Sequence, residues 1–516
     1  MSEAMQIHHK EHPVRSKLEK YPDYTAEIEA LENDGITEAL LQRIINKHQH
    51  NSTYNKSLID RYEALADGVP IFAREPRFGE GKDVINHKLN NDHFSEIIDF
   101  KTGFFAGNPI GYSYSDTEES QEDTGDAGDS KEEQKAARDA ASKVITDFVT
   151  RNNMFDVDME CTKFAAICGY AGRLFYIEEG TGYERVMVVP PNECIILSKT
   201  RDITHPTFGV RYYTIKNISD KNIVKAEFYD SNFIYYYEGG SVSDLKLVKQ
   251  EVNLFDGCPL QGIPNNREML GDAEKVLSLI DAYDRALSDA NNETEAFAHA
   301  YMVLENIHLD EEEAKAVQKA GAIEITTGPN GGKVYFLTKE INDAFIEHHL
   351  DRLEENIYRF SKTPNLSDEA FGTASGVSLK FKLTGLETKC GMFEAKMISA
   401  GTYMFTLLAS SWAKQQIKID PLQVVMDFRR NIPVDVQDEA SNVQALIAAG
   451  VPKQVAFAQL SFVDDVEYVM QLIEEEKSKV TAPSLTDDDD DDDEDDDKPV
   501  KKKKKAPANE AEDDDE

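Results

Sequence analysis

The chain has 516 residues, of which 40% are hydrophobic, so it is long enough for several domains with cores of their own. Its formal net charge of −40 excludes proteins that grip nucleic acid through a broadly basic surface. The five cysteines lie apart, without C-x-x-C spacing, which argues against a zinc ribbon and against a disulfide framework.

The N-terminal part of the chain is predicted to be helical after a flexible start. Residues 1–36 are polar, and we predict that they form a flexible N-terminus. The segment 113–133 is acidic and rich in Ser and Gly, with one large apolar side chain, so we predict a mobile loop there. Apolar residues at helical spacing predict helices over 37–50, 54–67, 92–106 and 134–152.

A run of strands is predicted from Cys168 to about Phe255. Short β-branched and aromatic stretches are separated there by glycine-containing turns. Within 224–228, apolar and charged residues alternate, which predicts a sheet with one wet face. The expected strands are 174–177, 186–189, 195–197, 210–215, 224–229 and 233–237.

Two helices with narrow apolar stripes are predicted on either side of a small module. They lie within 266–298 and 339–360, where apolar residues recur at steps of four and three. The stripes consist of Val276, Ile280, Tyr283 and Leu287, and of Ile346, Leu350, Leu353 and Ile357. A stripe this narrow suits helices that pack against copies of themselves, although an ordinary helical hairpin in one chain also fits it. The module between them, 299–338, is predicted to contain a strand, a helix and a hairpin with arms at 322–326 and 334–337.

The C-terminal third begins with a loop of polar and small residues, 361–376. A long helix and a strand are predicted to follow within 377–432, and short helices over 435–449 and 462–476, within 433–480. The tail, 481–516, holds an unbroken acidic block and five consecutive lysines, and we predict that it is disordered. Without residues 487–516 the chain still carries a charge of −29, so its acidity is not a property of the tail alone.

The search for catalytic chemistry gives no convincing site. The string Gly328–Val334 lacks the glycine spacing and the Ser or Thr of a P-loop. The carboxylates Asp156, Asp158 and Glu160 are closely spaced, as in a two-metal nuclease, but nothing nearby supplies the matching ligands. We therefore predict that the protein is not an enzyme, with no cofactor and no metal site. No segment has the pattern of a signal peptide or a membrane span.

Seven strings along the chain are informative through their order. They are Asn86–Pro109, Ala165–Tyr176, Val189–Glu193, Val210–Tyr213, Lys275–Asp284, Asn356–Phe360 and Pro433–Asp435. Together they resemble, over about residues 40–480, the portal proteins of tailed bacteriophages of the SPP1 type. The acidic segment near Ser113 and the tail after Ala482 are not part of this resemblance.

The resemblance implies a multidomain α+β portal fold that assembles as a ring of about twelve copies around a channel. Its parts would be a wing (37–265 and 377–432), a two-helix stem (266–298 and 339–360), an α/β clip (299–338), a tunnel loop (361–376) and a helical crown (433–480). The residues of the two stem stripes would then pack between subunits.

The implied partners are other copies of the chain, double-stranded DNA in the channel, the terminase large subunit, the scaffolding protein, the major capsid protein and a head–tail connector or adaptor. The implied location is the portal vertex of the virion, after assembly in the cytoplasm of the host bacterium. An acidic ring would repel the phosphate backbone and let DNA pass with little friction.

Local contacts with DNA would come from the tunnel loop and from the start of the long helix. The candidates are Lys362, Asn365, Ser367, Thr373, Lys380 and Lys382. Two features oppose this interpretation: Asp368 and Glu369 in the same loop would repel phosphate, and the lysines of the long helix could instead pair with acids of a neighbouring subunit.

Two other hypotheses are open at this point. The acidic block 487–497 suggests a chaperone of basic proteins, which would lose its activity if the tail were deleted, whereas a portal ring would remain intact. A motor or nuclease of the packaging machinery is the third hypothesis, and an absence of ATP hydrolysis by the pure protein would separate it from the other two.

Overall fold

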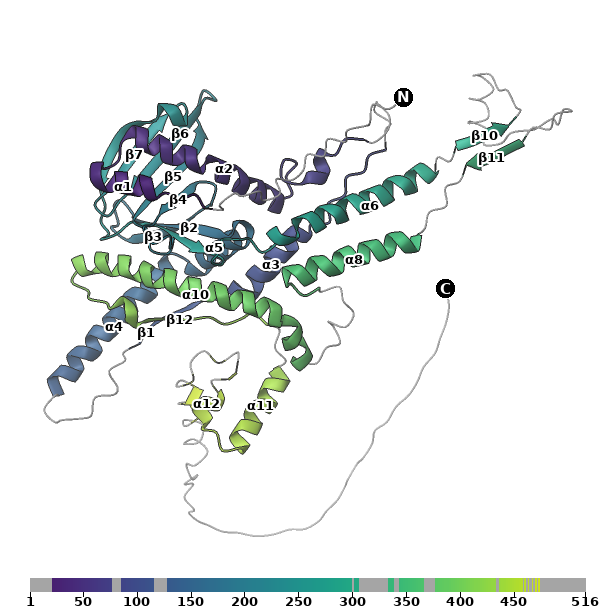
Figure 1. Ribbon diagram of the computed structural model, residues 1–516. Helices are drawn as coiled ribbons and strands as arrows, with labels where there is room; N and C mark the ends of the chain where they lie inside the picture. The colour runs from purple at the N-terminus through teal and green to yellow at the C-terminus, as the bar shows by residue number, and fades with distance from the viewer. Residues whose placement is uncertain are drawn as a thin grey trace, which may run out of the picture. The chain divides into compact units, whose positions relative to one another are not determined.

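The structure is a computed structural model (Figure 1). It describes residues 21–76, 85–115, 128–298, 301–305, 333–337, 343–365, 376–432 and 436–457, with single residues between 459 and 473. The chain divides into two compact units, residues 1–432 and residues 433–516. The division falls where the sequence predicts that the crown begins.

In the first unit, helices and antiparallel strands are mixed, as the predicted α+β class requires. Its helices are α1 (Thr25–Asp34), α2 (Glu38–Tyr62), α3 (His93–Ala106), α4 (Gly128–Arg151), α5 (Met154–Cys168), α6 (Leu277–Ala298), α8 (Asp343–Ser361) and α10 (Gly376–Lys414). Short 3-10 helices are η1 (Pro70–Ala73), η2 (Val242–Asp244), η3 (Glu274–Val276) and η4 (Pro421–Gln423).

The strands of the first unit form four antiparallel sheets among the described residues. A five-stranded sheet has the order β4 (Cys194–Leu197), β5 (Phe208–Lys216), β6 (Asn222–Tyr229), β7 (Phe233–Gly239) and β8 (Lys246–Val252). A three-stranded sheet has the order β3 (Glu184–Val189), β2 (Tyr170–Ile177) and β9 (Leu260–Pro264). Two further pairs are β1 (Gly111–Tyr114) with β12 (Val424–Asp427), and β10 (Tyr301–Glu305) with β11 (Lys333–Leu337). The six strands expected between Cys168 and Phe255 are confirmed, while β1, β8 and β9 were not predicted.

Helices α1 and α2 pack on one face of the five-stranded sheet (Figure 1). Ile28 and Leu31 of α1 are 5% exposed, and they share a core with Ile195 and Phe228 of the sheet. The prediction that all of 1–36 is flexible is therefore wrong for α1. The apolar positions Tyr24, Ile28 and Leu31 follow helical spacing, but the polar residues around them obscure the stripe.

Helix α2 is continuous, whereas the sequence predicts two helices that meet near residue 52. Polar residues at the expected break find partners that keep them inside the helix. The Ser52 hydroxyl donates to the carbonyl of Asn192 at 2.6 Å, and the Thr53 hydroxyl donates to the carbonyl of Gln49 at 3.0 Å. The tertiary contact of Ser52 thus helps to override the weak helix propensity of this stretch.

The three-stranded sheet lies in the main core together with α3, α4, α5 and α10. The first six residues of β2 are buried, because the strand is covered on both faces. On the helix side, Phe105, Phe148, Phe393 and Trp412 are each at most 2% exposed. Helix α5, which was not predicted, ends at Gly169. This glycine has a φ of +91°, and a Cβ there would meet the carbonyl of Met269, so only glycine fits.

The predicted mobile loop, 113–133, is corrected at both ends. Ser113 and Tyr114 belong to β1, which pairs with β12 from far along the chain. At the other end, residues 128–133 are part of α4. At the first end, β1 gains a strand partner that the local sequence does not reveal. At the second end, helix α4 extends further towards its N-terminus than predicted. Residues 116–127 lie outside the described part of the chain.

The described part of the second unit contains α11 (Val436–Ala448) and α12 (Lys453–Phe457). The first matches the helix predicted over 435–449, with Gly450 at a φ of +91° after it. Helix α12 was not predicted. Most of the expected helix 462–476, and the whole tail 481–516, lie outside the described residues.

Candidate functional site

The two predicted striped helices form an antiparallel hairpin, in which α6 and α8 lie side by side (Figure 1). At the far end of the hairpin, Tyr301 of β10 is paired with Leu337 of β11, and Glu305 with Lys333. Two of the strands expected in the clip module are therefore confirmed, and they pair with each other. The expected hairpin arm 322–326 and the helix before it lie outside the described residues.

The eight stripe residues fall into two groups. Val276, Ile280, Leu353 and Ile357 are between 0% and 8% exposed in the single chain. Three of them share a core with α2, α3 and α5, so their burial already has a partner within one subunit. Tyr283, Leu287, Ile346 and Leu350 are only partly buried. Tyr283 still packs against the same core, and the other three lie further out. These four remain predicted subunit-packing residues.

The polar face of α6 is covered by the segment 85–92, most of which belongs to the string Asn86–Pro109 but was given no contact with α6 in the sequence analysis. Side chains of α6 accept hydrogen bonds from backbone N–H groups of this segment. Asp284 accepts from Asn91 at 3.0 Å, Ser288 from Leu89 at 2.9 Å, and Asn292 from His87 at 2.6 Å.

This hydrogen-bond ladder has a simple geometric basis. Four residues of an α-helix rise by about 6 Å, and two residues of an extended chain advance by about 6.6 Å. Acceptors at every fourth position of α6 therefore match N–H groups at every second position of segment 85–92. The signal in the sequence is the Asp, Ser and Asn at positions 284, 288 and 292 of one helix face.

Where the hairpin meets the body, polar contacts join it to α2 and α3. Arg61 donates to Asp281 at 2.6 Å, and both side chains are less than 10% exposed. On the α8 side, the Tyr358 hydroxyl donates to Glu96 at 2.5 Å and lies 3.3 Å from the His93 ring nitrogen Nδ1. Burial and the neighbouring Glu96 carboxylate raise the pKa of Tyr358, so its hydroxyl stays protonated.

A buried charge cluster, consisting of Lys101, Asp272 and Lys389, lies at the same place. The Asp272 carboxylate accepts from the Lys101 ammonium at 2.7 Å and from the Lys389 ammonium at 2.5 Å. The Asp272 side chain is 2% exposed. Burial by itself would raise the pKa of Asp272, but the two lysines outweigh it and lower the pKa to about 2. The carboxylate is therefore ionised, and it joins α3, α10 and the segment before α6.

The loop root, residues 361–365, is the ordered start of the predicted tunnel loop. Helix α8 ends there in a Schellman motif: the N–H of Thr363 donates to the carbonyl of Tyr358 at 3.1 Å, and Lys362 has a φ of +59°. Asn365 then donates to Glu354 at 2.8 Å. Helix α10 passes over this turn at Gly385, where an added Cβ would lie 3.4 Å from that of Lys362.

The structure describes three of the six candidate DNA contacts. Lys362 is exposed and sits at the left-handed turn, Asn365 is bonded to α8, and Lys382 is partly buried on α10. Ser367 and Thr373 lie outside the described residues. Lys380 lies in α10, but its side chain is outside the described part. Their contact with DNA remains a prediction.

Asp158 and the end of the string that approximates a P-loop have structural roles. Asp158 is buried on α5, where it accepts from the Tyr112 hydroxyl at 2.6 Å and lies 3.8 Å from Arg173. Burial raises its pKa to about 6, against the effect of Arg173. Lys333 and Val334, the end of the string that approximates a P-loop, begin strand β11 instead of a helix. Among the described residues, no group of three potential ligands could hold a metal ion.

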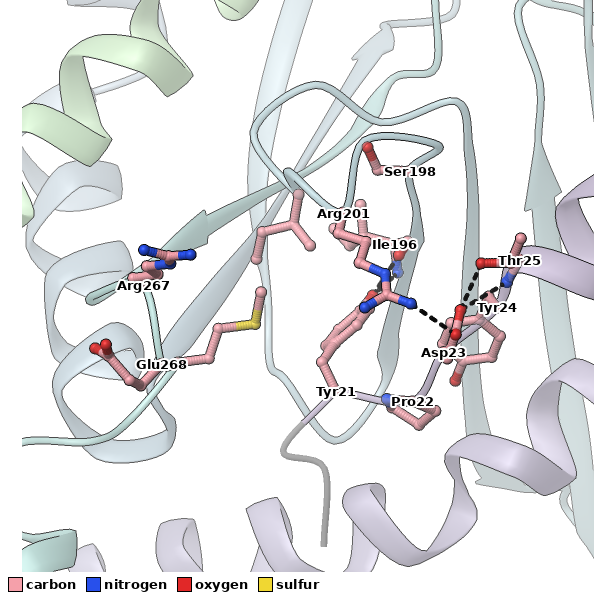
Figure 2. Close-up of a pocket in the computed structure, with 12 residues that line it drawn as sticks. Tyr21, Pro22, Asp23, Tyr24, Thr25, Ile196, Ser198, Arg201, Arg267 and Glu268 are labelled. Carbon is pink, nitrogen blue, oxygen red and sulfur yellow. Dashed lines mark hydrogen bonds and ion pairs between the residues drawn. The ribbon is translucent and has the colours of Figure 1, made fainter.

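A solvent-open cavity of about 330 Å³ lies between the start of the described chain and the five-stranded sheet (Figure 2). Arg201 donates to Asp23 at 2.7 Å, and Asp23 also accepts from the Thr25 hydroxyl at 2.6 Å. Arg267 and Glu268 line the opposite side (Figure 2). The ion pair joins the segment before α1 to the loop between β4 and β5.

Comparison with known proteins identifies the family. The family model described as "Phage portal protein, SPP1 Gp6-like" matches residues 41–482. The portal protein of Bacillus phage SPP1 is 26% identical over 322 residues, which cover 59% of this chain and 63% of that protein. The portal protein of Clostridium phage phiCD119 is 25% identical over 349 residues, covering 63% of this chain and 74% of the relative. The chain belongs to the SPP1-type family of phage portal proteins.

The family match agrees with the arrangement described above. It runs from α2 into the second unit and includes the hairpin, the loop root and α10. No helix in the described part of the chain is long and apolar enough to cross a membrane. The matched segment spans 63% of the SPP1 portal protein. The activity and partners of this chain are therefore proposals.

Proposed function

We propose that this chain is the portal subunit of a tailed bacteriophage, a structural component of the capsid and not an enzyme. About twelve copies would form a ring at one vertex, and double-stranded DNA would pass through the central channel during packaging and ejection. The observation that carries the proposal is the family match over residues 41–482, which includes both helices of the hairpin and the loop between α8 and α10.

Ring assembly would give the partly buried stripe residues a role. Tyr283, Leu287, Ile346 and Leu350 are partly buried in one chain and would become buried between neighbours. Phe345 and Phe360, at opposite ends of α8, are 68% and 55% exposed in the single chain, and a neighbouring copy would cover them. Neither phenylalanine was among the predicted packing residues.

The partners follow from the proposed position in the capsid. The module between α6 and α8 would meet the terminase large subunit and later a head–tail connector, while the body would contact scaffolding and major capsid proteins. The tunnel-loop candidates Lys362, Asn365, Ser367, Thr373, Lys380 and Lys382 would face DNA. Because the chain is strongly acidic, such contacts would be few and local.

End-on electron microscopy of the purified protein tests the proposal. The expected result is rings with a central hole wide enough for duplex DNA. A matched chain lacking residues 487–516 should form the same rings, whereas an acidic chaperone of basic proteins would lose its activity with this segment. Uniform monomers at every protein and salt concentration, with or without scaffolding protein, would contradict the proposal.

A further inference from the structure

The buried charge cluster does more than join helices of the body, because one of its lysines also holds the end of α8. The Lys389 ammonium donates to the backbone carbonyl of Ser361 at 2.8 Å, in addition to its 2.5 Å contact with Asp272. Ser361 is the last residue of α8 and is 2% exposed. A single side chain of α10 thus contacts the loop root and the segment before α6.

The charges of the cluster explain why this contact forms. Two lysines surround one carboxylate, so the cluster has one positive charge in excess. The C-terminus of a helix carries a partial negative charge on its unpaired carbonyl groups. The end of α8 therefore offsets part of the excess charge, and it is Lys389 that lies next to it.

The other lysine has no such contact to the loop root. Lys101 donates to Asp272 at 2.7 Å and to the side chain of Asn265, and its ammonium lies 4.7 Å from the centre of the Phe393 ring. All these groups belong to the body. The two lysines therefore share a carboxylate but differ in what else they hold.

We infer that Lys389 is a positioning residue that fixes the loop root against α10 and the segment before α6, and so sets where the chain enters the channel loop. This inference rests on the proposed portal function, since it assigns the loop after residue 365 to the channel. The contacts at Gly385 and Glu354 bring the loop root close to α10 and α8, but neither of them reaches Asp272.

Three substitutions separate positioning from folding. Lys389→Met leaves Lys101 and Asp272 as a neutral pair and removes the contact to Ser361. Lys101→Met is the matched control, because it also leaves one lysine with Asp272 but keeps the Ser361 contact. Lys389→Arg keeps the positive charge and the hydrogen-bond donors, so it should retain much of the contact with the carbonyl of Ser361. Asp272→Asn is unsuitable for this test, since it leaves two lysines without a counter-charge and should destabilise the whole fold strongly.

The first measurement is hydrogen exchange of the peptide that covers residues 358–365. Loss of a charge-assisted hydrogen bond at the helix end should speed exchange there about tenfold in Lys389→Met. Lys101→Met should match the wild-type chain in this peptide, and Lys389→Arg should fall between the two. Equal exchange rates in the two methionine variants would overturn the inference.

The second measurement is the amount of DNA packaged per capsid when the variants replace the wild-type portal. Lys389→Met should form rings yet package several-fold less DNA than Lys101→Met. Equal packaging by two ring-forming variants would also overturn the inference. If the wild-type chain forms no rings at all, the proposed function fails, while the exchange experiment still decides whether Lys389 holds the loop root.

Discussion

The two halves of the α6–α8 hairpin are stabilised in different ways. Next to the body, Val276, Ile280 and Ile357 are at most 1% exposed, and the buried charge cluster joins the helix ends to α3 and α10. Further out, α6 is held by the hydrogen-bond ladder to segment 85–92, and α8 exposes Phe345. Next to the body most stripe residues are buried within the single chain, whereas further out they are only partly buried.

In the proposed ring, one continuous stripe of the sequence would therefore serve two purposes. The spacing of apolar residues is the same in both halves, so it does not tell whether the partner is the same chain or another copy. The position of α2, α3 and α5 decides it, because these elements cover only the near half. The proposals for subunit packing therefore concern the residues that the single chain leaves partly buried or exposed.

The largest expected effect comes from one matched pair of truncations on α8. Ile357→Ala removes a side chain that is 0% exposed in the single chain, so it should lower the free energy of unfolding of the unassembled subunit by about 3 kcal/mol. Leu350→Ala should cost less than about 1 kcal/mol there, because Leu350 is only partly buried.

Ring assembly should reverse the order of these two effects. Leu350→Ala should shift the monomer–ring equilibrium towards monomers, measured by sedimentation velocity over a range of protein concentrations. Denaturant unfolding of the unassembled subunit measures the first effect. If the two variants lowered the free energy of unfolding by similar amounts, the distinction between the near and far halves would be wrong.

Acid should weaken the body end of the hairpin selectively. The pKa of Asp272 falls from its ordinary value of 3.8 to about 2 in the folded chain. The contribution of Asp272 to the free energy of unfolding is therefore fully present above about pH 4. It is lost as the pH falls through 2, a change of about 2 kcal/mol. Burial raises the pKa of Asp284 at the ladder, so its contribution has the opposite sign and favours folding as the pH falls.

Urea unfolding between pH 5 and pH 2 measures the effect of Asp272. Lys389→Met provides the control, because the loss of one lysine raises the pKa of Asp272 towards 3.8 and should shrink the acid-dependent change. An acid dependence that is the same in the wild type and in this variant would mean that the charge cluster does not govern it.

The ladder predicts a smaller effect. Ser288 is fully buried and accepts from the N–H of Leu89, so Ser288→Ala should cost about 1 kcal/mol, partly offset by the better helix propensity of alanine. The rate of amide hydrogen exchange should rise in segment 85–92, while the rate in α8 stays constant. Ser278→Ala, at an exposed position of the same helix, is the matched control and should leave this segment unchanged.

The smallest expected effect is a gain. Lys362 occupies a left-handed conformation that glycine adopts without strain, so Lys362→Gly should raise stability by about 0.5 kcal/mol in thermal unfolding. If the Lys362 side chain contacts DNA, the same variant should package less DNA even though it is more stable. A destabilised variant would contradict the assignment of this turn.

Local patterns determined several elements of the fold. The apolar periodicity of α3, α8 and α10, and the β-branched runs of β2 to β7, are properties of short windows, and the structure confirms them. The order of seven strings along the chain was enough to indicate the family, which the match over residues 41–482 establishes. The absence of a P-loop was equally visible, because that motif is local.

Tertiary structure alone decided the contacts that define the candidate site. Lys101, Asp272 and Lys389 are more than one hundred residues apart in sequence, and nothing near any of them signals a common cluster. The same holds for β1, which gains its strand character from β12, and for α2, whose polar middle is kept helical by Asn192. Spacing along the chain sets which face of a helix is apolar, but the chain that folds back against that face determines whether a residue is buried, paired or left for another subunit.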